Sequence, residues 1–387
     1  MTLARPYCGD LALELALRRH PDPAGGVPAL FAGRRISYSF NTRVAIRKAC
    51  DILGLKPGDE VLAPAYNCGS ELDPLHHAGL TIRLYPVTVR TEIDPGSVER
   101  MIGPRTRAIY LTHYFGFLQP AAGALRELCD RHGLWLIEDC ALSLLSGAPP
   151  ADGRAGHVAV FCFYKFFPVL GGGALVLNSP TLDGPSGFDR PAPTKVMVKR
   201  LMRAGLGAVL GMDRAAVLTR RLRGQAGGTP VDVPSETRPD MPGHYYFDPG
   251  LCDARIAGLT ARALRGFDIG TTIAARRANY LRLRDRIAGI AGIAPLFADL
   301  PPDTVPLSMP IQIAGSGRDA LARALQAEGI TATSWWSGYN RHLDFSTVPD
   351  ACHLKDHVLA LPMHQYFDDR AIDHVADRLQ LLSKQIG

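Results

Sequence analysis

The sequence predicts an α/β fold, a mainly parallel sheet with helices on both faces, followed by a smaller α+β domain. Between residues 41 and 177, short apolar runs alternate with amphipathic helical patterns, the order that builds parallel sheets. Residues 180–244 lose this alternation and are rich in proline and glycine. Long helical patterns return from residue 245. We therefore expect a large domain over residues 1–244, with a connecting or inserted region at about 180–244, and a smaller domain over 245–387.

The expected elements follow one another in a regular order. Residues 42–53 carry apolar side chains at an approximate helical spacing, which Gly54 ends. Strands are expected at 60–65, 81–87, 108–112, 134–137, 158–163 and 174–177, and helices at 72–78, 121–132, from 245 through 286, at 319–328 and at 369–382. Parallel sheets bind ligands at the carboxyl ends of their strands, so the residues that end these strands are the first candidates for a site.

The composition is that of a soluble globular protein, with 387 residues of which 47% are hydrophobic and 21% charged. No window reaches the roughly 18 apolar residues that span a bilayer, and the start of the chain lacks a secretory-signal pattern, so a cytoplasmic location is expected. The eight cysteines include no C-x-x-C pair. Neither a zinc ribbon nor a disulfide framework is therefore expected, and no metal site is predicted.

The net charge of +6 is concentrated in one segment. Residues 195–223 hold eight basic side chains and one acid, whereas the rest of the chain is near neutral. Nucleic-acid binding is not expected, because it favours basic and aromatic side chains spread over a broad face. The segment also carries many apolar side chains, so we expect a solvated helix pair that covers the site. Contact with a membrane surface or a lipid-linked substrate is the alternative.

Lys165 is the most informative single residue. It lies in the run FCFYKFFPVLGGGALV, among aromatic and aliphatic side chains where an ammonium group is costly to bury. Burial lowers the pKa of a lysine and makes its amine nucleophilic, which is the state that forms a Schiff base with a carbonyl compound. The alternative is a lysine at the end of a strand that reaches solvent.

Asp139 ends the apolar strand in LIEDCA, where a parallel sheet exposes its ligand site. Taken alone, it is equally consistent with a helix cap. Pyridoxal 5′-phosphate needs a lysine for its aldehyde and a carboxylate that keeps its pyridine nitrogen protonated. Asp139 followed by Lys165 therefore predicts a pyridoxal 5′-phosphate site.

Five passages of the chain stand in the order of one known family. They are LGLKPGDEVLAPAYNCGSELDPLHHAGL from residue 53, EIDPGSVERMIGPRTRAIYLTHYFG from 92, HGLWLIEDCALS from 132, GHVAVFCFYKFFPVLGGGALV from 156 and VLALPMHQYFDDRAIDHVADRL from 358. In these passages the chain resembles the DegT/DnrJ sugar aminotransferases, pyridoxal-phosphate enzymes of the aspartate aminotransferase fold type I. The passages cover most of the chain outside residues 180–245.

The resemblance implies that Lys165 forms the Schiff base and that Asp139 pairs with the pyridine nitrogen. The chain departs from the family at Leu142, where a Gln or His usually touches the phenolic oxygen of the cofactor. Lys165 also follows its strand by fewer residues than is usual. We therefore expect a divergent member of the family.

The resemblance also implies the residues that bind the cofactor. Thr42 and Arg43 stand where the family opens a helix whose backbone N–H groups cradle the phosphate, and Arg43 would add a charge-assisted hydrogen bond. Cys162 takes the place of a serine that contacts the phosphate. Tyr66 and Cys68 lie in the loop that supplies an aromatic ring stacked on the cofactor, with Tyr66 the only ring of the two.

Four further residues are candidates for substrate binding. His113, in LTHYFG, resembles a family position near the active site, although a histidine at the end of a strand is often structural. Tyr339, Arg341 and His342 belong to WWSGYNRH, a polar and aromatic run suited to stacking on a sugar or pairing with a phosphate or carboxylate. The two tryptophans of this run are equally consistent with packing between domains.

These residues and the resemblance predict an aminotransferase that moves an amino group, from glutamate, to a keto group of a nucleotide-linked sugar. Other pyridoxal-phosphate chemistry on a non-sugar substrate is an alternative that Leu142 keeps open. A regulatory protein without turnover is a third, but a bare scaffold needs neither Lys165 nor Asp139. The resemblance implies a homodimer whose interface lies beside the cofactor. The apolar content of residues 66–75, which is more than one exposed loop requires, agrees with it.

Overall fold

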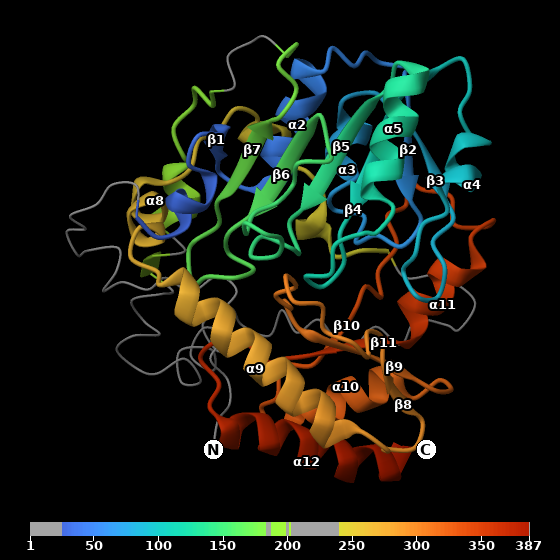
Figure 1. Ribbon diagram of the computed structural model, residues 1–387, viewed down its shortest axis with the longest axis vertical. Helices are drawn as coiled ribbons and strands as arrows, with labels where there is room; N and C mark the ends of the chain where they lie inside the picture. The colour runs from blue at the N-terminus through green and yellow to red at the C-terminus, as the bar shows by residue number, and fades with distance from the viewer. Residues whose placement is uncertain (1–24, 183–186, 199–200, 203–239, 387) are drawn as a thin grey trace.

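The computed structural model describes residues 25–182, 187–198, 201–202 and 240–386. Its larger sheet has the strand order β1-β7-β6-β5-β4-β2-β3 (Figure 1). The strands are β1 (Arg35–Ser39), β2 (Glu60–Pro64), β3 (Thr81–Tyr85), β4 (Thr106–Thr112), β5 (Trp135–Cys140), β6 (Val158–Cys162) and β7 (Gly173–Leu177). All pairs among β2 to β6 are parallel, whereas β7 runs antiparallel to β6 and β1. The predicted mainly parallel sheet is confirmed.

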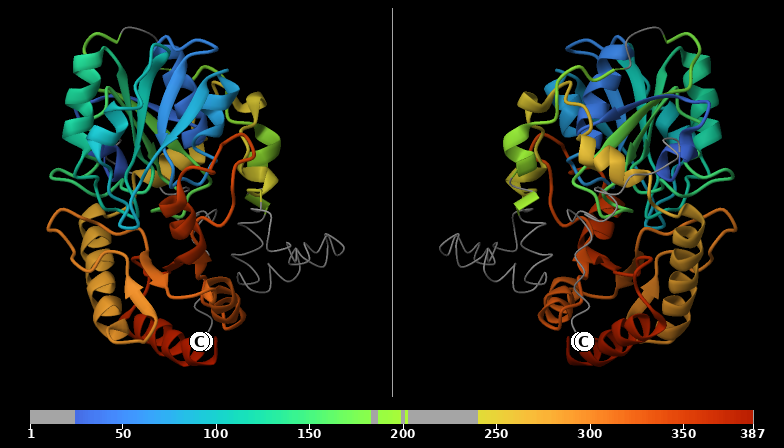
Figure 2. Two further views of the ribbon diagram at one scale, coloured as in Figure 1. Left: turned by 90° about the vertical axis from the view of Figure 1, so that its right-hand side faces the viewer. Right: turned by 90° about the vertical axis from the view of Figure 1, so that its left-hand side faces the viewer.

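Helices precede β2, β3, β4 and β5 and cover the sheet, whereas no helix lies among the described residues between β5 and β6. They are α2 (Thr42–Ile52), α3 (Asp73–His77), α4 (Pro95–Glu99) and α5 (Ala122–His132). Every residue of β2, β6 and β7 is buried, as expected of strands that are covered on both faces. Figure 2 shows the strands between helices on either side.

The smaller domain is built on an antiparallel sheet with the strand order β10-β11-β9-β8. Its strands are β8 (Ile293–Pro295), β9 (Met309–Ile313), β10 (Thr333–Ser334) and β11 (Val358–Leu361), and its helices are α9 (Ile269–Ile287), α10 (Arg318–Ala327), α11 (Pro349–His357) and α12 (Asp369–Ile386). The long helix α9 descends from the larger sheet and packs against α12 (Figure 1). The predicted α+β architecture of this domain is confirmed.

The segment between the two sheets differs from the expected pattern. The helical stretch expected from residue 245 is divided into short 3₁₀ helices at Gly243–Tyr245 and Pro249–Leu251, then α8 (Gly258–Leu264) and α9. Ala263 and Leu264 of α8 belong to the same buried cluster as Phe161 of β6. The domain boundary at residue 244 stays a prediction.

Two expectations concern surfaces. The basic segment at residues 195–223 lies outside the described residues, apart from 195–198 and 201–202. In the part of the chain that the structure describes, no helix has the length and hydropathy needed to cross a membrane.

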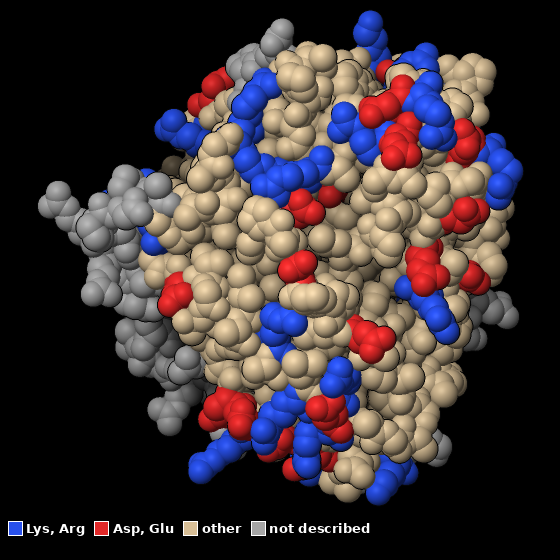
Figure 3. Space-filling view, in the orientation of Figure 1, with Lys and Arg blue, Asp and Glu red and all other residues tan. Residues whose placement is uncertain are grey.

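Positive and negative side chains alternate where α9 and α12 pair, at the lower end of Figure 3. Arg282 of α9 forms ion pairs there with Asp369 and Asp373 of α12.

The apolar segment at residues 66–75 is buried inside the chain. Tyr66, Leu72 and Leu75 are each 0% exposed, so the single chain already covers them. This apolar content therefore does not indicate a partner surface.

Candidate functional site

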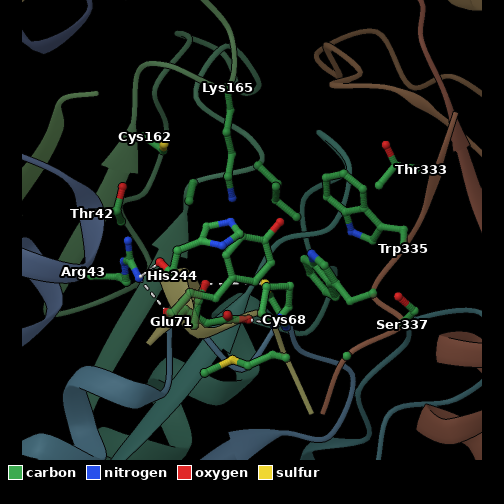
Figure 4. Close-up of a pocket in the computed structure, with 18 of the residues that line it drawn as sticks. Thr42, Arg43, Cys68, Glu71, Cys162, Lys165, His244, Thr333, Trp335 and Ser337 are labelled. Carbon is green, nitrogen blue, oxygen red and sulfur yellow. Dashed lines mark hydrogen bonds between the residues drawn. The ribbon is translucent and has the colours of Figure 1, made fainter. Parts of the chain in front are cut away.

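A cavity of about 950 Å³ lies where the carboxyl ends of the parallel strands meet the smaller domain. Thr112, Asp139 and Cys162, at the ends of β4, β5 and β6, line one side. The other side is formed by residues 333–338 of the smaller domain and by residues 241, 242, 244 and 245. In Figure 4, Lys165 extends into this cavity from the side opposite Cys68 and Glu71. The cavity is thus at the place expected for a ligand of a parallel sheet.

The Asp139 carboxylate is fixed by two hydrogen bonds. Its Oδ1 accepts the backbone N–H of Ala141 at 2.8 Å, and its Oδ2 accepts the Tyr110 hydroxyl at 2.8 Å. Asp139 is 4% exposed, and this burial raises the pKa of its carboxyl group although the Lys165 ammonium opposes the shift. Each oxygen keeps a second lone pair for a ligand.

Lys165 lines the same cavity and is half-buried. Burial alone would lower the pKa of its amine, as the sequence analysis expected. The acidic groups of Cys162, Asp139, Cys68 and Glu71 outweigh burial, so the pKa of Lys165 is raised. The expectation of a depressed pKa is therefore wrong for the protein without ligand, because the sequence did not show how many acids surround the amine.

The first turn of α2 opens on the cavity. The Asn41 side chain caps the helix by accepting the Val44 N–H at 3.0 Å, and Thr42 and Arg43 line the cavity. The Thr42 hydroxyl donates to the Phe161 carbonyl at 3.0 Å, which fixes the helix start against β6. A Cβ atom on Gly173 would approach the Thr42 nitrogen to 2.7 Å, so glycine is needed for this close packing.

Arg43 holds a loop rather than an open anion site. Its Nη1 donates to the carbonyls of His244, Tyr245 and Tyr246, at 3.1, 2.5 and 2.8 Å. These bonds fix the segment that contributes His244 and Tyr245 to the cavity (Figure 4). The expected charge-assisted bond from Arg43 to a phosphate would compete with these carbonyls.

Of the two residues expected in the loop that stacks on the cofactor, Cys68 lines the cavity and Tyr66 does not. Tyr66 is 0% exposed, and its hydroxyl donates to the Trp335 carbonyl at 2.8 Å behind the cavity wall. Cys68 lines the cavity, and burial raises the pKa of its thiol. The aromatic side chains that line the cavity are instead Tyr164, His244, Tyr245, Trp335 and Trp336.

Cys162 lies in the lining, as expected, and is 1% exposed. Burial raises the pKa of its thiol, while hydrogen bonding to Thr42 and the Lys165 charge oppose the shift. The thiol therefore serves as a neutral group between the start of α2 and Lys165.

His113 is part of the core and not of the cavity lining. Its Nδ1 accepts the Gln119 N–H at 2.9 Å, which leaves the proton on Nε2 for the Glu138 carboxylate at 2.8 Å. Cys140 lies close enough to complete a potential metal-ligating group with these two side chains. Because protein groups already engage both ring nitrogens, the arrangement supports a structural role for His113.

Tyr339, Arg341 and His342 lie beside the cavity and do not line it. The Tyr339 carbonyl accepts the Met241 N–H at 2.8 Å. The Arg341 guanidinium lies 4.5 Å from the centre of the Tyr246 ring, and the His342 ring stacks on His76 at 4.0 Å. The contacts of Tyr339 and Arg341 attach residues 241–246 to the smaller domain, and the contact of His342 attaches α3 to it.

The structure adds lining residues that the sequence analysis missed. Glu71 is 8% exposed and Thr112 is 2% exposed, and the Glu71 Oε2 and Thr112 Oγ1 atoms have no hydrogen-bond partner among the described residues. His244 and Arg323 also line the cavity. The position of Thr112 at the end of an apolar strand was a usable signal. The sequence holds no comparable signal for His244 and Arg323, because a loop and a helix that are distant along the chain bring them to the cavity.

The lining fits pyridoxal 5′-phosphate. It offers an amine at Lys165, a fixed buried carboxylate at Asp139, and a helix N-terminus at Thr42, the arrangement that favours a phosphate. The unpartnered Thr112 Oγ1 supplies a further polar group to a ligand. These are the functional groups of an aldehyde-binding, pyridine-binding and phosphate-binding site in one cavity.

Comparison with known proteins agrees with this chemistry. The family model described as "DegT/DnrJ/EryC1/StrS aminotransferase family" matches residues 36–186. A dTDP-3-amino-3,4,6-trideoxy-alpha-D-glucose transaminase of Streptomyces venezuelae is 39% identical over 146 residues, which are 36% of this chain and 38% of that protein. A UDP-N-acetyl-3-dehydro-alpha-D-glucosamine 3-aminotransferase of Acidithiobacillus ferrooxidans is 26% identical over 86% of this chain and 80% of its own length. The chain thus spans well under two thirds of the first relative.

The fold is that of a solved aminotransferase. The crystal structure of the aminotransferase TlmJ from Streptoalloteichus hindustanus superposes with a TM-score of 0.65 at 18% identity, covering 91% of this chain and 87% of that one. The fold class predicted from the sequence is confirmed by this likeness. Through residues 36–186, which include the strand-end aspartate and the following lysine, the chain is similar to the DegT/DnrJ/EryC1/StrS aminotransferase family.

Proposed function

We propose that this protein is a pyridoxal-phosphate-dependent aminotransferase that transfers an amino group to a keto group of a nucleotide-linked sugar. One observation carries the proposal: the Lys165 amine and the Asp139 carboxylate line the same cavity at the carboxyl ends of the parallel strands. Each influences the pKa of the other, which places the two charges close together.

Bound pyridoxal phosphate supplies an electron sink that stabilises negative charge on a substrate carbon. The Asp139 carboxylate would hold the proton on the pyridine nitrogen, and the Tyr110 and Ala141 hydrogen bonds keep it oriented. The first turn of α2 would bind the phosphate, with Thr42 and Cys162 beside it. Lys165 Nζ would hold the aldehyde carbon and then move a proton at the substrate carbon.

The relatives support the substrate class. Their names specify sugars linked to dTDP or UDP. The smaller domain supplies polar side chains to the cavity, including Arg323, Gln326 and Ser337, which suit the hydroxyl and phosphate groups of such a substrate. Glutamate is the proposed amino donor.

Leu142 favours a second candidate, other pyridoxal-phosphate chemistry on a non-sugar substrate. Its side chain lines the cavity and is 2% exposed, at the position where the family has a Gln or His. A leucine cannot hydrogen-bond to the phenolic oxygen of the cofactor. A panel of amines and keto sugars, with transfer of the amino group measured for each, separates the two candidates.

The test of the proposed function is covalent trapping. Borohydride reduction of the pyridoxal-phosphate-loaded protein should attach the cofactor to the peptide that contains Lys165, as measured by mass spectrometry, because Lys165 lines the cavity together with Asp139. Lys165→Ala should lose this adduct and the amino-transfer activity. Asp139→Ala should retain cofactor on Lys165 and lose most turnover, because the electron sink needs the protonated ring.

Lys56→Ala is the control, since Lys56 is an exposed lysine that does not line the cavity. It should behave as the wild type. Trapping on other lysines with none on Lys165 would refute the assignment of Lys165, and full turnover by Asp139→Ala would remove Asp139 from its role.

We also propose that the protein acts as a homodimer, as its similarity to the DegT/DnrJ family suggests. In this type of fold, loops of one subunit complete the site of the other. Sedimentation at working concentration should give twice the mass of the chain. A monomer with full activity would contradict the dimer.

A further inference from the structure

A buried lysine that takes no part in the proposed chemistry lies directly behind the cavity wall. Lys355 belongs to α11 and is 0% exposed. Its Nζ donates to three backbone carbonyls, those of Asn67 at 2.6 Å, Gly338 at 2.8 Å and Trp336 at 3.3 Å. An ammonium group has three N–H donors, so each of them has one acceptor.

These three carbonyls belong to two opposite parts of the cavity wall. Asn67 follows β2 of the large domain and directly precedes Cys68, which lines the cavity. Trp336 and Gly338 bracket Ser337 in the smaller domain, and all three line the cavity. One side chain therefore joins the large-domain wall to the smaller-domain wall.

The surroundings of Lys355 favour a charged amine. The rings of Tyr339 and Phe345 have their centres 4.8 and 5.2 Å from Nζ, within range of cation–π attraction. Four acidic groups face it, Cys68 and Glu71 from the large domain and Cys352 and Asp356 from α11. One further charge, that of Arg318 at the start of α10, contacts the Lys355 carbonyl.

We infer that Lys355 is a positioning residue, whose ammonium group joins the loop at Asn67 to the loop at residues 336–338 and thereby sets the shape of the ligand cavity. The hydrogen bonds of its Nζ all go to backbone carbonyls of the wall, so it acts through Cys68 and Ser337 and not on the ligand itself. The effect on cofactor binding rests on the proposed function, whereas the joining of the two loops does not.

The protonation state of Lys355 provides a signature that separates positioning from overall stability. Burial lowers the pKa of Lys355 to about 8. As pH rises through this value, the neutral amine keeps two N–H donors for three carbonyls, so one contact with the wall is lost. The same lowered pKa makes the contribution of Lys355 to the free energy of unfolding increase between pH 8 and the ordinary pKa of lysine, because the unfolded chain binds the extra proton there. Above about pH 8 the cavity wall is therefore expected to loosen, although Lys355 does not lower the free energy of unfolding there.

Hydrogen exchange tests the inference without any ligand. Lys355→Met keeps an unbranched apolar side chain that is one atom shorter and removes the three donors. Amides of residues 67–70 and of residues 336–340 should both exchange about tenfold faster, the effect of losing charge-assisted hydrogen bonds. The exposed Lys56→Met is the matched control and should exchange as the wild type does. Unchanged exchange in either segment of Lys355→Met would overturn the inference.

A second measurement uses the wild-type protein and pyridoxal 5′-phosphate as the probe. Its dissociation constant, followed by visible absorbance, should rise about tenfold as pH passes through about 8. Lys355→Met should bind pyridoxal 5′-phosphate more weakly than the wild type already at neutral pH, and its dissociation constant should not rise as pH passes through about 8. The same rise of the dissociation constant with pH in Lys355→Met would overturn the role of Lys355.

The two measurements keep the two proposals apart. A wild-type protein that binds no pyridoxal phosphate would refute the proposed function, while hydrogen exchange would still decide the joining of the loops. If Lys355→Met does not fold, hydrogen exchange of the wild-type protein tests whether Lys355 joins the two loops. After correction for the intrinsic effect of pH on exchange, the amides of both segments should lose protection together as pH rises through about 8. Protection of the two segments that does not change across this pH range would overturn the inference that Lys355 joins them.

Discussion

At the scale of single residues, the site is defined by more acids than the sequence indicated. The sequence analysis paired one carboxylate, Asp139, with one amine, Lys165. The structure places Glu71 and two thiols around the same amine, and their combined effect raises its pKa. A pKa depends on every charge within several ångströms, and residues 68 and 71 lie far from 165 in the sequence. This is why the sequence could single out Lys165 but could not predict the pKa of its amine.

Glu71 provides a prediction at this scale. Burial and the neighbouring Asp139 raise the pKa of its carboxyl group, and its Oε2 has no partner among the described residues. An acid whose pKa is raised on folding weakens the folded state as pH rises from its ordinary value to the raised one. Glu71→Gln should therefore increase the free energy of unfolding at neutral pH, while Gln keeps an acceptor for the Cys68 N–H.

Urea unfolding at a series of pH values measures this effect. The difference between Glu71→Gln and the wild type should shrink as pH falls below the ordinary pKa of glutamate, 4.5, where the wild-type carboxyl group is protonated in both the folded and the unfolded state. Glu92→Gln, at an exposed position, is the control and should match the wild type. A variant less stable than the wild type at neutral pH would show that Glu71 forms a stabilising ionised contact instead.

At the scale of elements, the sequence predicted best where burial is uniform. β2, β6 and β7 are short apolar runs with every residue buried, and α2 shows a helical spacing of apolar residues after a capping Asn41. The short helix α4 was missed although Asp94 and Pro95 give an ordinary start signal, with the Asp94 carboxylate accepting the N–H groups of Gly96 and Ser97.

The elements of the smaller domain were harder to predict for a physical reason. β10 has two residues and β8 has three, too few for an alternation of apolar and polar side chains to be visible. Their pairing partners lie elsewhere along the chain, as with Thr333 opposite Ala360. Such strands exist because β9 and β11 provide hydrogen-bonding edges, which local sequence does not reveal.

At the scale of the whole molecule, the cavity is formed by segments that are far apart in sequence. Arg43 holds residues 244–246, and Lys355 joins residue 67 to residues 336–338. The sequence analysis expected substrate contacts from Tyr339, Arg341 and His342, while the structure brings the neighbouring residues 333–338 to the cavity. Which residues of this loop line the cavity depends on how the two domains meet.

Because the cavity is bounded by both domains, a ligand in it should stabilise the molecule as a unit. A ligand that binds only the folded state raises the free energy of unfolding by about 2.7 kcal/mol at 100 times its dissociation constant. Pyridoxal 5′-phosphate should therefore raise the midpoint of thermal unfolding of the wild type, increasingly with concentration. Lys165→Ala should show a smaller rise at each concentration, since it keeps Asp139 and the start of α2 but lacks the covalent contact. This variant also retains the surface lysines, so it controls for their reaction with the aldehyde. Calorimetry of both proteins with and without the ligand measures the difference, and an equal rise in both would show that the stabilising contact lies outside this cavity.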